Sequence, residues 1–204
     1  MAKSHPFKHL RTILKHRHRV IKNASHFGIF WQAQFHDLSK FGFKEFSTSA
    51  RYYTGTHSPV YEERIHNDFF STICQHHTKK NKHHWEYYVD FFAGRLVIAS
   101  MPWNYAMEYV ADTLSASYTY NPKAFSGQVT LDYFNRYCPR YQMTKLTEEF
   151  IRWCLETYAE SGFKGLKKKA TKAKYEELAA IHPKIEIRES LTPAEALPAK
   201  QGRI

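Results

Sequence analysis

The segment from Phe7 to Phe27 repeats apolar residues at steps of three and four positions, which is the spacing of one face of an α-helix. That face consists of Ile13, His16, Val20, Ala24 and Phe27. His18 instead aligns with the basic positions Lys15 and Lys22. A histidine on an apolar face needs a hydrogen-bond partner or a metal ion once it is buried. The sequence therefore predicts a helix that directs His16 to the core and His18 to solvent.

Helical spacing recurs along most of the chain, and no run of alternating β-branched residues predicts a sheet. We therefore expect an all-α fold. The predicted helices after the first cover residues 29–40, 42–53 and 61–77, a segment that begins after Pro102, one or two segments within 130–160, and residues 172–181. In the helix over 61–77, Ile65, Phe69 and Ile73 should face inward.

The chain carries a net charge of +11. Its first acidic residue is Asp37, and Lys164 to Lys174 contains six lysines without an acid. Such runs attract nucleic acid or acidic ligands, or they form a solvated surface. We expect the solvated surface, because no RNP motif or zinc-finger spacing accompanies them. Residues 1–160 should form the helical domain, and residues 161–204 a basic helical and extended C-terminal tail.

The sequence gives no sign of a membrane protein or a secreted protein. No apolar run approaches the ~18 residues that a membrane span needs, and the N-terminal residues lack the apolar stretch of a secretion signal. The cysteines Cys74, Cys138 and Cys154 form no CxxC pair, and we expect them to be reduced thiols. We expect a cytoplasmic protein without a membrane partner.

Histidine is concentrated in one part of the chain, with 12 of the 13 within the first 84 residues. His36 stands beside Asp37, and Asp112 falls on the apolar face of the helix after Pro102, where a carboxylate is costly unless it is paired or binds a metal. Imidazole and carboxylate together suit one or two divalent transition metals, namely Fe, Mn, Zn, Ni or Co. The candidate ligands are His16, His36, Asp37, Asp112 and members of the pairs His76/His77 and His83/His84, with His77, His83 and His84 preferred.

The residues around His36 also indicate a reaction. The Asp37 carboxylate can bridge two metals while His36 binds one of them, and a water held there loses a proton near neutral pH. Lys40 lies one helical turn later and can reach a phosphoryl oxygen, which suits hydrolysis of a phosphate ester. Asp37 and Lys40 are thus the candidate catalytic residues. Glu86 and Arg51 could assist, although each also suits a surface ion pair.

The motifs HRHRV, HDLSK and VADTLSAS occur in this order and resemble the His, His-Asp, Asp signature of the HD-domain superfamily of metal-dependent phosphohydrolases. HRHRV matches the first motif with His16, four residues before Val20. Together with HHTKKNKHHWEYY, they resemble a narrower family of small bacterial and phage HD-like proteins over residues 7–120. The resemblance implies an HD-like helical bundle, additional ligands from the histidine pairs, and hydrolysis of a small phosphorylated molecule such as a nucleotide.

Two other functions stay open. A branch of the HD fold performs non-haem di-iron oxygenase chemistry with a similar set of His and Asp ligands. Alternatively, the chain could be a non-catalytic module that binds nucleic acid with its basic segments and holds a structural metal. We expect the remaining histidines to be structural or exposed: His5, His9, His18, His57, His66 and His182. The sequence does not determine the oligomeric state.

Overall fold

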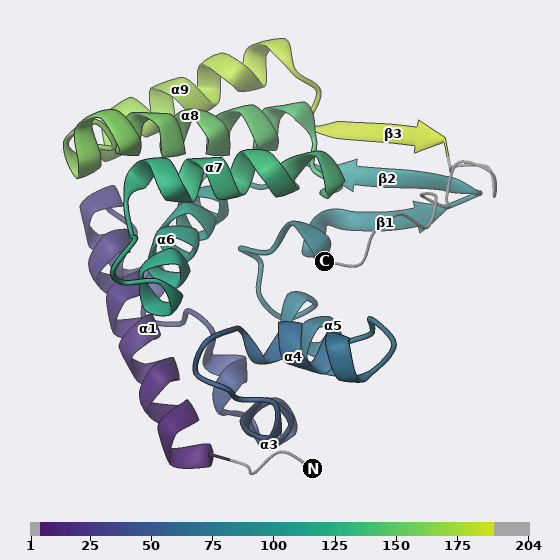
Figure 1. The fold of residues 1–204 in the computed structure, drawn as a ribbon. Coiled ribbons are helices and arrows are strands. Elements are labelled where there is room, and N and C mark those ends of the chain that lie inside the picture. The colour runs from purple at the N-terminus through teal and green to yellow at the C-terminus, as the bar shows by residue number, and fades with distance from the viewer. Residues whose placement is uncertain (1–4, 190–204) are drawn as a thin grey trace.

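The computed structural model describes residues 5–189, and the expectation of a predominantly helical fold is confirmed (Figure 1). Its helices, 3₁₀ turns and strands are α1 (Pro6–Phe27), α2 (Phe30–Ala33), η1 (Leu38–Phe41), α3 (Phe43–Arg51), α4 (Pro59–His66), α5 (Thr72–Thr78), η2 (Trp85–Tyr88), β1 (Val89–Phe92), β2 (Arg95–Ala99), α6 (Trp103–Tyr120), α7 (Gly127–Tyr137), η3 (Cys138–Arg140), α8 (Lys145–Ser161), η4 (Gly162–Lys164), α9 (Lys168–Ile181) and β3 (Ile185–Glu189).

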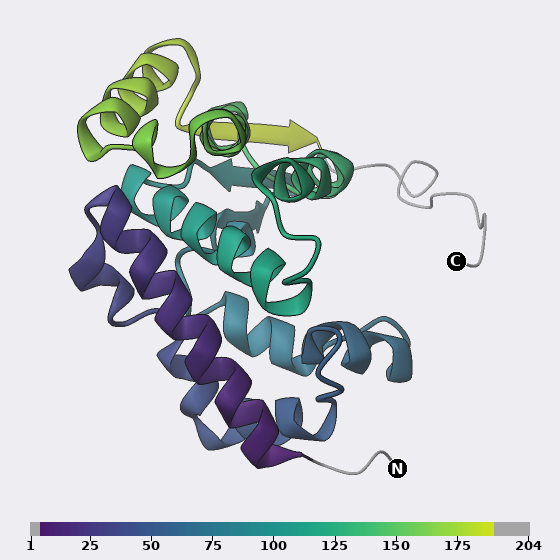
Figure 2. The same cartoon turned by 60° about the vertical axis from the view of Figure 1, so that its left-hand side comes forward.

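The long helix α1 runs along one side of the molecule and packs beside α6 (Figures 1 and 2). The helices α7, α8 and α9 lie together at one end, and α3, α4 and α5 lie at the other. The hydrophobic core joins α1, α6 and α8, where Val20, Val110 and Phe150 are each 0% exposed. Helices α1 and α6 therefore lie between the two ends of the molecule and contact residues from both.

The predicted first helix is confirmed as α1. Proline at position 6 starts it, and Gly28 ends it with a left-handed φ of 76° that glycine adopts without strain. The predicted inward face is buried along its whole length, including His16, whereas His18 is exposed. Helical phase alone thus separated the two histidines correctly.

Two predicted helices are wrong. Residues 29–40 form only the four-residue α2 and the 3₁₀ turn η1, because Asp37 between them has a left-handed backbone with φ 53°. Residues 61–77 are divided into α4 and α5, because Asp68 and Phe69 have φ values of 46° and 65°. Ile65 and Phe69, which were expected to face inward, are 54% and 87% exposed, and of the three expected residues only Ile73 is buried.

A small antiparallel sheet, which the sequence did not predict, has the strand order β1-β2-β3. Strands β1 and β2 are joined at Ala93 and Gly94, whose positive φ values of 50° and 76° suit a two-residue hairpin turn. Strand β3 comes from the predicted tail and pairs with β2. Leu166 and Leu178 also belong to the hydrophobic core, so residues 161–189 pack on the helical body. Residues 190–204 of the predicted tail lie outside the described residues.

Within residues 5–189, no helix is both long enough and apolar enough to cross a membrane. The three cysteines are free thiols, and Cys138 and Cys154 are buried. This agrees with the expectation of reduced cysteines.

A buried carboxylate holds the start of α5 in place. Glu63 of α4 is 3% exposed and accepts hydrogen bonds from the Ser71 hydroxyl at 2.5 Å, the Thr72 hydroxyl at 2.7 Å and the Ile73 backbone N–H at 3.1 Å. The three donors stand at the first turn of α5, where backbone N–H groups have no partner within the helix. Glu63 therefore fixes the position of the short helix that carries His77.

We predict that Glu63→Ala lowers the free energy of unfolding by about 1.5 to 3 kcal/mol, the usual value of hydrogen bonds to a charged group. In a chain of this size the melting temperature should fall by about 5 to 10 °C. Thermal unfolding monitored by circular dichroism checks this. The matched control is Glu62→Ala, the neighbouring position of the same helix, whose carboxylate forms an ion pair with the exposed His57. Equal melting temperatures for the two variants would contradict the role of Glu63.

Candidate metal centre

The segment that contains His36 and Asp37 is irregular and is held from both sides. Arg17 of α1 donates hydrogen bonds to the backbone carbonyls of Gln34 and His36. On the other side, Asn104 of α6 donates to the Gln32 side chain at 2.7 Å. These contacts fix a short stretch that has little helix of its own, so the two site residues are placed by the helices around them.

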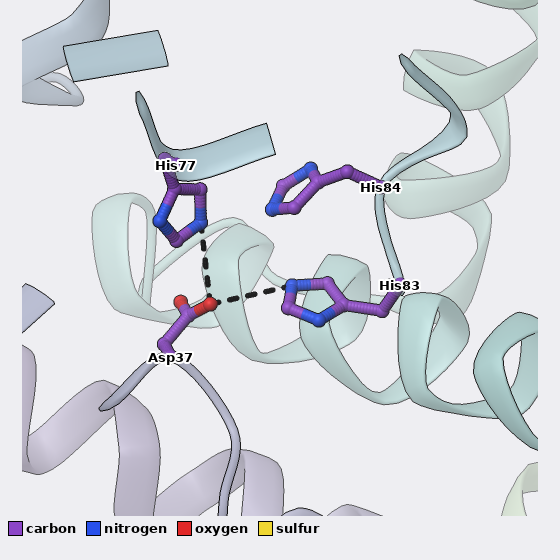
Figure 3. Close-up of side chains that lie close together, drawn as sticks. All are labelled: Asp37, His77, His83 and His84. Atoms are coloured by element: carbon purple, nitrogen blue, oxygen red, sulfur yellow. Dashed lines mark ion pairs between the residues drawn. The ribbon is translucent and has the colours of Figure 1, made fainter. Parts of the chain in front are cut away.

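The Asp37 carboxylate lies at the centre of the buried polar cluster and is 2% exposed. Its Oδ2 is 3.3 Å from Nε2 of His36 and 2.5 Å from Nζ of Lys40. Its Oδ1 is 3.2 Å from Nε2 of His77 and 3.4 Å from Nε2 of His83. Figure 3 shows His77 and His83 directed at that oxygen, with His84 beside them. The two oxygens of one carboxylate therefore face two different sets of side chains.

These side chains form two groups of four that share Asp37. Within each group, one candidate ligand atom per residue lies within 4.8 Å of all the others. Site 1 consists of His16, His36, Asp37 and Asp112, and site 2 consists of Asp37, His77, His83 and His84. Each group could hold a metal ion, and Asp37 would be a ligand in both. All seven predicted ligands are therefore brought together.

Two further carboxylates, which the sequence reasoning missed, orient the histidines. Glu108 Oε1 is 2.9 Å from Nδ1 of His36 and 3.2 Å from Nδ1 of His83. Glu45 Oε1 is 2.8 Å from Nδ1 of His77. An ionised carboxylate only accepts, so each imidazole donates from Nδ1 and directs Nε2 at the site, as is usual for metal-binding histidines. The sequence contains one indication of the role of Glu108: it precedes Asp112 by one helical turn, so the two carboxylates lie on the same face of α6.

Charges within the cluster shift its pKa values strongly. Burial alone would raise the pKa of Asp37, but the positive charges of His36, His77 and Lys40 hold it well below its ordinary value. Burial opposes protonation of His77, but Asp37 raises its pKa to about 9. The hydrogen bonds from His36 and His83 lower the pKa of Glu108 to about 2 against the effect of burial. The carboxylates thus stay ionised, and protons on His36 and His77 balance their charge.

The hydrogen bonding of these residues tests whether a metal fits. Nε2 of His84 is buried and forms no hydrogen bond or ion pair within residues 5–189. Nε2 of His36 and of His83 and both oxygens of Asp37 are also buried, and the described residues give them ion pairs but no hydrogen bond of good geometry. Buried polar atoms in this state are rare in folded proteins, and a bound ion is a common partner for them. Imidazole nitrogens and carboxylate oxygens are the donors that divalent transition metals accept. The side chains present therefore fit a metal centre, although they do not identify the metal.

A cavity of about 310 Å³ adjoins the two sites. Its walls include side chains of α1, α3, α4, α5 and α6, and five of the predicted residues border it: His16, Lys40, His77, His84 and Asp112. A larger groove of about 500 Å³ lies on the surface between Phe35, Phe43 and His76, and no residue of site 1 or site 2 lines it. The smaller cavity is therefore the one that can bring a molecule to the metal centre.

The structure distinguishes the members of the histidine pairs. His77 faces Asp37, whereas Nδ1 of His76 is 3.1 Å from Oε2 of Glu45 and His76 belongs to neither site. His83 and His84 both belong to site 2. Glu86 borders the cavity, which agrees with an assisting role, while Arg51 is exposed and does not border it. His9, which was expected to be structural or exposed, is 5% exposed and also borders the cavity.

We predict that the metal-free chain loses stability as the pH rises from 6.5 to about 9. The folded-state pKa of His77 lies above the value of 6.5 for an unfolded chain, so its proton stabilises the fold below pH 6.5 and this contribution is lost as the pH approaches 9. Melting temperatures measured in a chelator check this, with His77→Gln giving a flatter profile. A bound divalent metal should remove the decline, because it replaces the proton. An unchanged melting temperature across this range would contradict the assignment.

Comparison with known proteins gives one match, which covers most of the chain. Residues 5–179 match the family of unknown function DUF5662. Neither the curated proteins nor the solved structures contain a match. All seven candidate ligands and the two orienting glutamates lie within the matched residues. The chain therefore belongs to the family of unknown function DUF5662.

Proposed function

We propose that the chain is a metal-dependent phosphohydrolase that acts on a small phosphorylated molecule. The observation that carries the proposal is the buried Asp37 carboxylate, which lies between two groups of metal donors and in contact with the cation of Lys40. Sites of this kind, with two divalent ions near one another, are typical of phosphate-ester hydrolysis. The order of the motifs around His16, His36-Asp37 and Asp112, which resembles that of HD-domain phosphohydrolases, supports the same function.

Divalent metals held by the two sites would supply an activated water molecule and would neutralise charge on the phosphoryl group. The identity of the metals stays within the set expected from the donor types, namely Fe, Mn, Zn, Ni or Co. Asp37, which belongs to both groups of donors, would be the ligand common to the two metals.

The chain supplies the remaining charge stabilisation. Lys40 borders the cavity, and Asp37 and Asp112 raise the pKa of its ammonium group against the effect of burial, so it stays protonated at neutral pH. Arg64 adds a second cation to the cavity wall. Fixed cations beside a phosphoryl group stabilise the charge that develops as the ester bond breaks. In this proposal, Lys40 binds the phosphoryl oxygens of the substrate and Asp37 binds the metals.

Hydrolysis of phenyl phosphate after loading with Mn²⁺, Fe²⁺, Zn²⁺, Ni²⁺ or Co²⁺ tests the proposal. We expect phosphate release with at least one metal. Removal of one electrostatic stabilising group costs about 10²- to 10³-fold at other active sites, and we expect Asp37→Asn to reduce kcat/KM by at least this much, because Asp37 belongs to both sites. Asparagine also adopts the left-handed backbone of position 37, so this variant changes the charge without straining the turn. Lys40→Met should lower kcat/KM as well.

The matched control is His57→Gln, which changes an exposed histidine that borders neither the sites nor the cavity. Equal turnover by the parent chain and Asp37→Asn would contradict the proposal. Dioxygen uptake by the Fe²⁺-loaded chain, with no phosphate release under any metal, would favour the oxygenase alternative.

A further inference from the structure

The cavity beside the metal centre has a second set of polar groups that the proposed hydrolysis does not use. His9 of α1 and Ser49 of α3 are each 5% exposed, and Nε2 of His9 is 2.7 Å from Oγ of Ser49. Both side chains border the cavity. His9 precedes the site 1 ligand His16 by seven residues, which is about 10 Å along a helix. This pair therefore lies well apart from the metal donors of α1.

Several of these polar groups have unused hydrogen-bonding capacity. Nδ1 of His9 is buried and forms no hydrogen bond within residues 5–189, and the same is true of Oε2 of Glu86. Burial, and to a lesser degree the charge of Lys40, lowers the pKa of His9 to about 4, so the imidazole is neutral at pH 7. The Ser49 hydroxyl donates to the backbone carbonyl of Phe46 at 3.1 Å, so His9 donates to Ser49 from Nε2 and is left with Nδ1 as an acceptor. Nδ1 of His9, the remaining lone pair of Ser49 Oγ and Oε2 of Glu86 can therefore accept hydrogen bonds from a ligand that carries hydroxyl groups.

The size and lining of the cavity favour a small ligand without an aromatic base. Its volume of about 310 Å³ is at the lower end of the range of about 300 to 1,000 Å³ that is usual for small-molecule sites. Nucleobases are commonly recognised by stacking between aromatic side chains. Among the described residues that line the cavity, Tyr120 is the only tyrosine, phenylalanine or tryptophan, so a base would lack a pair of aromatic walls.

We propose that the substrate is the phosphate monoester of a small polyol or sugar, with its phosphoryl group at the metal centre and its hydroxyl groups on His9, Ser49 and Glu86. This inference rests on the proposed hydrolase function and replaces the expectation of a nucleotide. In the reaction, the oxygen of water bonds to phosphorus and the bond between phosphorus and the polyol oxygen breaks. One proton of the water passes to that oxygen, so the products are inorganic phosphate and the free polyol. His9, Ser49 and Glu86 are binding residues that determine specificity.

The first test compares kcat/KM for ribose 5-phosphate, adenosine 5′-monophosphate and phenyl phosphate. We expect ribose 5-phosphate to be the best substrate by at least about tenfold, which corresponds to one hydrogen bond of about 1.4 kcal/mol. The ratio of kcat/KM for ribose 5-phosphate to that for phenyl phosphate should fall about tenfold in Ser49→Ala and in Glu86→Gln, mainly through KM. Ser47→Ala is the matched control, because Ser47 lies on the same helix but is exposed.

A preference for adenosine 5′-monophosphate, or a ratio that is unchanged in both Ser49→Ala and Glu86→Gln, would overturn the inference and leave the hydrolase function intact. Failure to hydrolyse any of the three esters would overturn the hydrolase function. In that case, calorimetric binding of ribose 5-phosphate to the metal-loaded chain decides the inference. Binding that weakens about tenfold in Ser49→Ala but not in Ser47→Ala supports it, and absence of binding to the parent chain overturns it.

Discussion

The structure depends on one buried carboxylate. Asp37 is 2% exposed in a protein interior where an isolated negative charge would be very unfavourable. Its two oxygens are surrounded by His36, His77, His83 and Lys40. Either protons on the histidines or bound metal ions can balance the negative charge of Asp37. Proton binding and metal binding therefore compete at this cluster, and both affect the stability of the fold.

The cluster also connects parts of the molecule that share little hydrophobic core. Site 1 draws on α1, the turn before η1 and α6, which belong to the main body. Site 2 adds His77 from α5 and His83 and His84 from the segment that follows it. The region of α3 to α5 is rich in exposed aromatic residues, such as Phe43 and Phe69, and contributes few residues to the core. Ligands that bind only the folded state stabilise it, so a metal at site 2 would fix this region against α1 and α6.

Much of the site could be predicted from the sequence, because its polar residues interrupt otherwise apolar helix faces or form clusters of metal-binding residue types. His16 and Asp112 occupy apolar faces of helices that do form, so helical phase identified both. His36-Asp37 and the histidine pairs were recognised as clusters of metal-binding residue types. Lys40 was expected from its spacing after Asp37, and its ion pair with that residue agrees with the expected proximity.

The remaining features depend on contacts distant in sequence. Glu108 and Glu45 are ordinary helical glutamates until folding brings His36, His83 and His77 against them. The left-handed backbone at Asp37 and the break at Asp68 and Phe69 occur at residues whose local propensity does not require them. The strands were missed because β1 and β2 are joined by Ala93-Gly94, a turn with a weak local signal, and because β3 pairs with a strand that lies far from it in the sequence.

The metal content of the purified chain, measured by elemental analysis after loading and removal of free metal, tests the central claim most directly. We predict two divalent ions per chain, one ion in His84→Gln, which removes a ligand of site 2 alone, and loss of both in Asp37→Asn. Absence of bound metal in the parent chain, or an unchanged metal content in Asp37→Asn, would contradict this claim.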